Sequence, residues 1–423
     1  MSLQIFPRSY FAVELVESIL EHIYGEYESL QNPLDLFQCA LVCRDWRLIA
    51  QRLIFAELHL APGGEGIKIF QEDDKHHLLV YVRRVWMHDA FGGIEDNLSS
   101  LPNLRQIYAL AASNTASASR DPNQWPYLKR IKIFTGDHLT TLGLASTFFP
   151  VKILRHCTSL RELSIEGCLI DQEDVPRGGP VHAAPLQQLH SFDFRAWNTQ
   201  TMEVLWWMLG PQGPFDFTKL RTLRISDRTD LIAEHAATQA LVTQCAATVR
   251  DLMVSPQAKY AWPSTNLTPE RLFHPSNLTN LRSIRISIRQ ELYGHINFVP
   301  WMTAFFSSLP GDTKLEEIFI PSWFPEYPHI EFDDDIGDYN WGSLDDVLSS
   351  RIPRLKQVII SAYGPGAKSG PLSSTYVHHI IVPGLLKAFP KLTQRSMLRV
   401  INSLDIGYVS REECWWNRLI HGV

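Results

Sequence analysis

The chain has 423 residues, of which 45% are hydrophobic and 20% charged, as in a folded protein of two or three domains or one long repeat array. Its 39 Lys and Arg against 45 Asp and Glu give a net charge of −6, without the basic excess typical of nucleic-acid binders. No stretch approaches the ~18 apolar residues that span a bilayer, and the amino-terminal residues lack the apolar core of a signal peptide. We therefore expect a cytoplasmic or nuclear protein without a membrane segment, whose six cysteines are thiols.

Residues 11–58 predict a compact set of helices. VELVESILEHI at residues 13–23 places its apolar side chains on one helical stripe, with glutamates on the opposite side. In CALVCRDWRLIAQRLIF at residues 39–55, a second stripe consists of Val42, Trp46, Ile49 and Leu53. Three short helices hold more apolar surface than such a small bundle can bury alone, so we expect it to contact the rest of the chain or another protein.

A six-residue phrase recurs through the middle of the chain, with apolar residues at its first, fourth and sixth positions. Its ten copies begin at residues 82, 104, 128, 160, 189, 220, 249, 281, 315 and 355. Eight copies carry Lys or Arg at the second position, where about one would be expected from 39 such residues in 423. Helix-like runs such as TMEVLWWML and VPWMTAFFSSL separate the phrases. One strand and one helix every 22–40 residues predict a solenoid with a parallel sheet and a continuous core.

The phrases match Leu-x-x-Leu-x-Leu, and this segment resembles the leucine-rich-repeat family. That family usually has Asn or Cys eight residues after the first Leu, where the side chain bonds free backbone groups. Only the copy at residue 160 has this feature, as Cys168, so the resemblance implies an irregular horseshoe. We expect IFAELHL at residues 54–60 to supply a first strand that joins the helical segment to the array.

The helical segment resembles a second family. ELVESIL, LFQCALVCRDWRLIA and IFAEL together follow the pattern of the F-box family, although Phe11 and Ala12 stand where that family usually has Leu-Pro. Proteins of this family dock on a Skp-type adaptor of cullin–RING ubiquitin ligases, and a following repeat domain holds the substrate. The resemblance implies a non-catalytic substrate-recognition subunit. Its adaptor-binding residues would be Leu15, Ile19, Leu36, Val42 and Trp46.

We therefore predict an α/β protein with three parts. An F-box-like helical domain at residues 11–58 precedes an irregular leucine-rich-repeat solenoid of parallel strands with helices at 59–365, and a capping region at 366–423 follows. The alternative function is a leucine-rich-repeat interaction scaffold whose helical head caps the solenoid, without any ubiquitin ligase.

Strand alternation predicts which repeat residues a substrate contacts. The fourth and sixth positions should point into the core, among them Ile165, Leu223, Ile225, Ile284 and Ile286. The third and fifth positions should then line the open face of the sheet, namely Arg84, Trp86, Tyr108, Arg130, Lys132, Glu162, Ser164, Asp193, Arg224, Met253, Arg285, Phe319 and Ile359. Their charges nearly cancel, whereas a nucleic-acid groove has a basic majority, so we expect a protein segment as the ligand. Trp86, Tyr108 and Phe319 are expected to be exposed contact residues.

No motif in the chain indicates catalysis or a cofactor. Cys39 and Cys43 share a helix face, but a zinc site needs two further ligands, and no CxxC or HxxxH lies nearby. GPGAKSG at residues 364–370 lacks the glycine spacing of a phosphate-binding loop. The acidic run at 331–338 lacks the twelve-residue rhythm of a calcium loop and is better explained as a solvated loop. We expect no metal, cofactor, nucleic acid or membrane partner.

Overall fold

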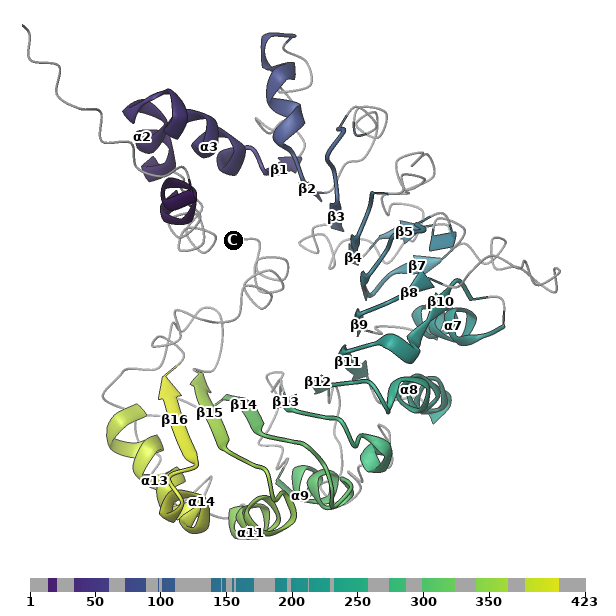
Figure 1. Cartoon of the computed structure of the whole chain (residues 1–423). Helices are drawn as coiled ribbons and strands as arrows, with labels where there is room; N and C mark the ends of the chain where they lie inside the picture. Colours follow the sequence, from purple (N-terminus) through teal and green to yellow (C-terminus); the bar gives the residue numbers. More distant parts are fainter. Residues whose placement is uncertain are drawn as a thin grey trace, which may run out of the picture. The chain divides into compact units, whose positions relative to one another are not determined.

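The computed structural model (Figure 1) describes residues 14–20, 34–60, 73–88, 98, 101–110, 138–145, 147–149, 154–155, 157–170, 187–195, 199–211, 213–228, 232–257, 274–286, 299–323, 340–363 and 377–402. The chain forms two compact units. Unit 1 consists of Met1–Asn114, Arg130–Ile133 and Ser410–Val423, and unit 2 of Thr115–Lys129 and Phe134–Val409. In the ranges just given, no helix is long and apolar enough to cross a membrane.

Unit 1 begins with the helices predicted for this segment. Residues 14–20 are helical, and helices α2 (Leu34–Val42) and α3 (Arg44–Ile54) follow. Asp45 in the first turn of α3 and Arg52 in its last turn both suit the helix dipole, and Arg52 also pairs with Glu17 of the first helix. We call residues 14–54 the helical head.

Three strands of unit 1 run parallel and pair side by side. They are β1 (Glu57–Leu60), β2 (Arg84–His88) and β3 (Gln106–Leu110). The 3₁₀ helix η1 (Asp73–Tyr81) lies between β1 and β2 in the chain. Strand β1 is the first strand predicted from IFAELHL, and it follows α3 directly, so the head leads straight into the sheet of its unit.

The large sheet has nine parallel strands in the described part of unit 2, and strands of successive repeats pair with each other. They are β4 (Thr141–Ala145), β6 (Glu162–Glu166), β9 (Ser191–Arg195), β11 (Thr222–Arg228), β12 (Asp251–Gln257), β13 (Ser283–Ile286), β14 (Glu317–Trp323), β15 (Gln357–Tyr363) and β16 (Leu398–Asn402). Two short pairs accompany this sheet, β5 (Phe148–Phe149) with β7 (Leu169–Ile170) and β8 (Gln187–Gln188) with β10 (Phe215–Asp216). One parallel strand per repeat is the arrangement of a leucine-rich-repeat solenoid.

The predicted register of the repeats is confirmed. In every described copy the fourth and sixth residues are at most 2% exposed, including Ile165, Leu223, Ile225, Ile284 and Ile286. Adjacent copies pair position for position, as Leu223 with Leu252 and Ile225 with Val254. The copy at residues 128–133 lies outside the described residues.

The helices of unit 2 cover the outer side of its sheet (Figure 1). They are α7 (Thr199–Leu209), α8 (Ile232–Cys245), α9 (Val299–Ser307), α11 (Trp341–Arg351), α13 (Val382–Ala388) and α14 (Pro390–Gln394). The first four occur where the sequence has helix-like runs between the phrases. Buried aromatic residues such as Trp301 and Phe305 of α9 complete the core between helices and sheet. Asp345 of α11, 1% exposed, accepts hydrogen bonds from the amides of Lys391 and Leu392 at 2.8 and 3.0 Å and so caps α14.

Candidate functional site

The helical head has a small core of its own. Val16, Leu20, Leu36, Ala50 and Leu53 are buried against one another, and half-buried Trp46 and Ile49 pack on them. Leu36 is fully buried, so its side chain is not available to a partner, which corrects its prediction as a contact residue. It belongs to the core because α2 turns this side toward α3 and the first helix.

The helices of the head also carry exposed apolar side chains. Among the described residues, nine large hydrophobic side chains are exposed, and six of them lie in the head: Leu15, Ile19, Phe37, Leu41, Val42 and Leu48. Leu41 and Val42 at the end of α2 are 72% and 62% exposed. Three of the predicted adaptor-binding residues, Leu15, Ile19 and Val42, thus lie on this surface. We call these six residues the apolar head surface.

The open face of the unit 1 strands is covered by two rows of side chains. The rings of His59, Trp86 and Tyr108 stack in one row, with centroids 5.7 and 4.4 Å apart. Arg84 lies in the other row and contacts Glu57 at 3.1 Å and Gln106 at 2.6 Å. Trp86 is only 8% exposed, so its predicted exposure is wrong.

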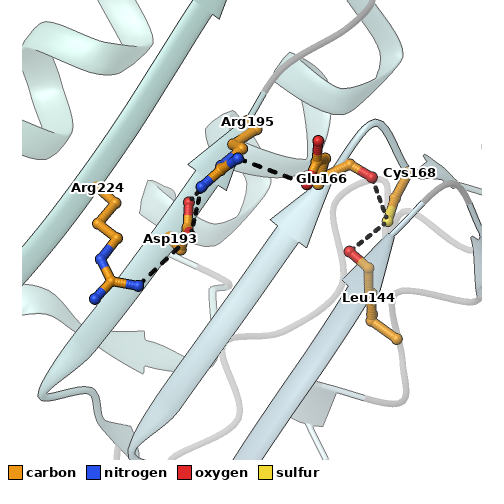
Figure 2. A network of polar contacts seen from close by, with 6 residues as sticks. All are labelled: Leu144, Glu166, Cys168, Asp193, Arg195 and Arg224. Atoms are coloured by element: carbon orange, nitrogen blue, oxygen red, sulfur yellow. Dashed lines mark hydrogen bonds and ion pairs between the residues drawn. The ribbon is translucent and has the colours of Figure 1, made fainter. Parts of the chain in front are cut away.

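On unit 2, four charged side chains form a network in which two buried carboxylates meet two half-buried arginines (Figure 2). Arg195 donates from Nε and Nη2 to the two carboxylate oxygens of Asp193, at 3.2 and 3.5 Å, and its Nη1 lies 3.9 Å from Glu166 Oε2. Arg224 Nη1 lies 4.0 Å from Asp193 Oδ2. Asp193 is 4% exposed and Glu166 3% exposed. Asp193, predicted on the open face, is therefore buried there by its neighbours.

Two carboxylates and two guanidinium groups balance the charge of this network. Removing charges from water costs solvation energy, so a buried cluster of this kind contributes little net stability. Its main effect is to fix the position of its side chains. Arg224, whose side chain is 19% exposed, is the member most accessible to a ligand.

The row of fifth-position residues continues across the next strands. Met253, Arg285, Phe319 and Ile359 lie side by side on β12 to β15, and all are half-buried. The guanidinium carbon of Arg285 lies 4.2 Å from the centroid of the Phe319 ring, a cation–π contact. Arg224, Met253, Arg285 and Phe319 thus form one continuous surface, which we call the sheet-face row.

The remaining predicted contact residues do not form a further cluster. Glu162 is exposed, and Ser164 is half-buried. Arg130 and Lys132 lie outside the described residues. No group of three or more His, Cys, Asp or Glu side chains able to hold a metal is present in the part of the chain that the structure describes.

The cysteines of unit 2 are structural. Cys168 donates to the carbonyl oxygens of Leu144 at 3.3 Å and Glu166 at 3.4 Å (Figure 2), which is the backbone bonding expected at this repeat position. Burial raises the pKa of Cys157 and Cys245 to about 12 and that of Cys168 to about 11. These thiols stay protonated at neutral pH and are poor nucleophiles.

The chain is similar to solved structures, but not to family models or curated proteins. No protein-family model matches it, and no curated protein matches it. The leucine-rich-repeat-containing protein LegL7 from Legionella pneumophila is 11% identical, over 80% of this chain and 97% of that chain, with a TM-score of 0.35. An internalin (inlF) from Listeria monocytogenes is 11% identical, over 79% and 92%, with a TM-score of 0.26. The sheet, with one parallel strand per repeat, identifies the fold. It is a leucine-rich-repeat solenoid.

Proposed function

We propose that this protein is the substrate-recognition subunit of an SCF-type cullin–RING ubiquitin ligase. In this function the helical head docks on a Skp-type adaptor, the repeats hold a protein substrate, and the chain itself performs no chemistry. The observation that carries the proposal is the apolar head surface, because six of the nine exposed large hydrophobic side chains of the described residues lie there.

The side chains of the apolar head surface are more stable in contact with a protein partner than in contact with water. Six exposed large apolar side chains in one small helical segment indicate an interaction site, whereas scattered single ones are ordinary. Leu41 and Val42 lie next to each other at the end of α2, within the stretch that resembles the F-box family. The separate core beneath them, around Leu36, holds the helices in place without a partner. The surface is therefore prepared before binding, which lowers the entropic cost of docking.

The sheet-face row supports the substrate-binding part of the proposal. Arg224 is positioned by the Asp193 network and Arg285 by its contact with Phe319, so both cations are held in place on the open face. Met253 lies between them, and Phe319 follows on the next strand. A peptide segment that combines carboxylates with an apolar side chain would match this surface.

An interaction scaffold without a ligase partner is the second candidate. It is favoured by the packing of α3 against η1 and by the direct passage from α3 into β1, since both are also features of a helical cap on a repeat array. The two functions differ in one property. Only the ligase subunit needs the apolar head surface for a partner.

Co-purification of the full chain with a Skp-type adaptor separates the two candidates. Val42→Arg places a charge on the apolar head surface and should abolish co-purification. Val80→Arg is the matched control, because Val80 is also an exposed valine of unit 1, 44% exposed, but lies on η1 outside the head. Loss of the adaptor with Val42→Arg alone supports the ligase subunit. Absence of any complex with the unmodified chain would favour the scaffold.

A further inference from the structure

The second residues of the repeat phrases form a line along one edge of the unit 2 sheet. The backbone carbonyl of Arg221 accepts hydrogen bonds from the amides of Arg250 and Asp251 at 2.8 and 3.1 Å, and the same paired bonds recur between successive copies. The backbone carbonyl of Arg250 in turn accepts a hydrogen bond from the amide of Arg282 at 2.7 Å. The second positions are thus in register, at the ~4.8 Å spacing of neighbouring strands.

This line is strongly basic and exposed. Its cations are Arg161, Arg221, Arg250, Arg282 and Lys356, and the residues just before the first Leu of three copies add Lys219, Lys314 and Arg354. All eight are exposed. We call them the basic row. The whole chain has a net charge of −6, so the basic row reverses the sign of the charge locally.

Few counter-charges lie along the basic row. Glu316, the acidic residue at a second position, pairs with Lys356 at 2.8 Å, and its pKa is lowered by that hydrogen bond and by the nearby Arg282. Within the described ranges, Arg161, Arg221 and Arg250 take part in no ion pair and no side-chain hydrogen bond. Like charges opposite each other on neighbouring strands repel. An anionic ligand would relieve this repulsion.

Acidic side chains do occur at the third position, one residue further along. Glu162, Asp251 and Glu317 are exposed, and strand alternation directs them to the open face of the sheet. They therefore belong to another surface and leave the edge itself basic.

We propose that the basic row binds an acidic peptide segment of a partner protein, laid across the starts of the strands. Guanidinium groups bind carboxylates with two parallel hydrogen bonds, and five of the eight cations are arginines. Proteins that bind single-stranded nucleic acid stack its bases on aromatic rings, and the exposed residues of this edge include no Phe, Tyr or Trp. The described positions of the basic row include no exposed apolar residue that could enter a bilayer, which argues against a membrane as the ligand. This surface is separate from the apolar head surface and does not depend on adaptor binding.

The test uses the full chain and fluorescein-labelled hexaglutamate as the probe, with binding followed by fluorescence anisotropy at low salt. Arg221→Glu combined with Arg250→Glu should weaken binding at least about tenfold, because two attractive pairs become repulsive. Arg44→Glu combined with Arg399→Glu is the matched control, since both arginines are exposed outside the basic row, on α3 and β16, and the net charge changes equally. Arg221→Gln with Arg250→Gln should give an intermediate loss.

Retained binding by the control pair, together with loss in the Arg221 and Arg250 pair, supports the proposal. No binding to the unmodified chain, or an equal loss in both pairs, would overturn it. Labelled hexathymidylate and phosphatidylserine vesicles serve as comparison probes. If either binds the basic row more tightly than hexaglutamate, the acidic peptide is the wrong partner class.

Discussion

Trp86 stacks on Tyr108, with ring centroids 4.4 Å apart and ring planes 23° apart. The two residues are opposite each other in β2 and β3, and His59 of β1 extends the stack on the other side of Trp86. Aromatic pairs of this geometry contribute about 0.5–1.5 kcal/mol each beyond the area they bury. The stack therefore ties the three strands of unit 1 together on their open face, in addition to the backbone hydrogen bonds.

Removing the central ring should destabilise unit 1. We expect Trp86→Ala to lower the free energy of unfolding by about 3–5 kcal/mol, as for other buried large-to-small changes, and Trp86→Phe to cost clearly less. Urea unfolding followed by circular dichroism measures both. Equal stability of Trp86→Ala and the unmodified chain would show that the ring has no structural part.

Two neighbouring isoleucines of β15 test the repeat register. Ile360 is 1% exposed and points into the core, whereas Ile359 is half-buried on the open face. Ile360→Ala should cost about 2–5 kcal/mol through the cavity it leaves, and Ile359→Ala about 1 kcal/mol or less. Chemical denaturation of the two variants compares them directly. A larger loss for Ile359→Ala would mean that the alternation is reversed.

Neutralising one member of the charged network should destabilise unit 2. Asp193→Asn removes the charge that faces Arg195 and Arg224, and hydrogen bonds to charged groups are worth about 1.5–3 kcal/mol. Asp251→Asn is the control, because Asp251 is exposed on β12 and should cost less than about 1 kcal/mol. Thermal unfolding of both variants gives the comparison. Similar costs for the two would show that the network does not act as a buried unit.

Thiol reactivity should follow burial. Cys43 is exposed and should be alkylated by iodoacetamide in the folded chain, whereas Cys157, Cys168 and Cys245 should react only after denaturation. Their pKa values of about 11–12 in the folded chain exceed the ordinary value of 9.0, so the folded state holds these protons more tightly. Their contribution to stability is present below pH 9 and is lost as the pH rises toward 12. Mass spectrometry of the modified peptides identifies which thiols react.

The repeat register could be predicted from sequence because apolar alternation and a basic second position recur together. Strand β4 was missed since its phrase, LTTLGL from residue 139, has Thr140 at the second position and Gly143 at the fifth. Strand β16 does not match the phrase because its copy begins with Arg395 in place of an apolar residue; in the structure its Leu398 and Val400 are half-buried. Both strands follow the sheet geometry although their sequences depart from the phrase.

The side-chain contacts on the open face could not be predicted. Glu166 and Arg195 lie at a seventh position, beyond the six-residue phrase, so their meeting with Asp193 depends on the pairing of β6 with β9. The burial of Trp86 likewise depends on rings supplied by the two adjacent strands. Alternation shows the face on which a side chain lies. It does not show how much of that side chain its neighbours cover.

Hydrogen–deuterium exchange of the full chain with and without a Skp-type adaptor tests most directly whether the head is a docking site. Peptides from residues 14–20 and 34–54 should become protected in the complex, because the partner would cover the surface around Leu41 and Val42. Peptides from the unit 2 strands should exchange as in the free chain. Protection confined to the unit 2 strands, or the absence of any complex, would contradict the proposal that this protein is a ligase subunit.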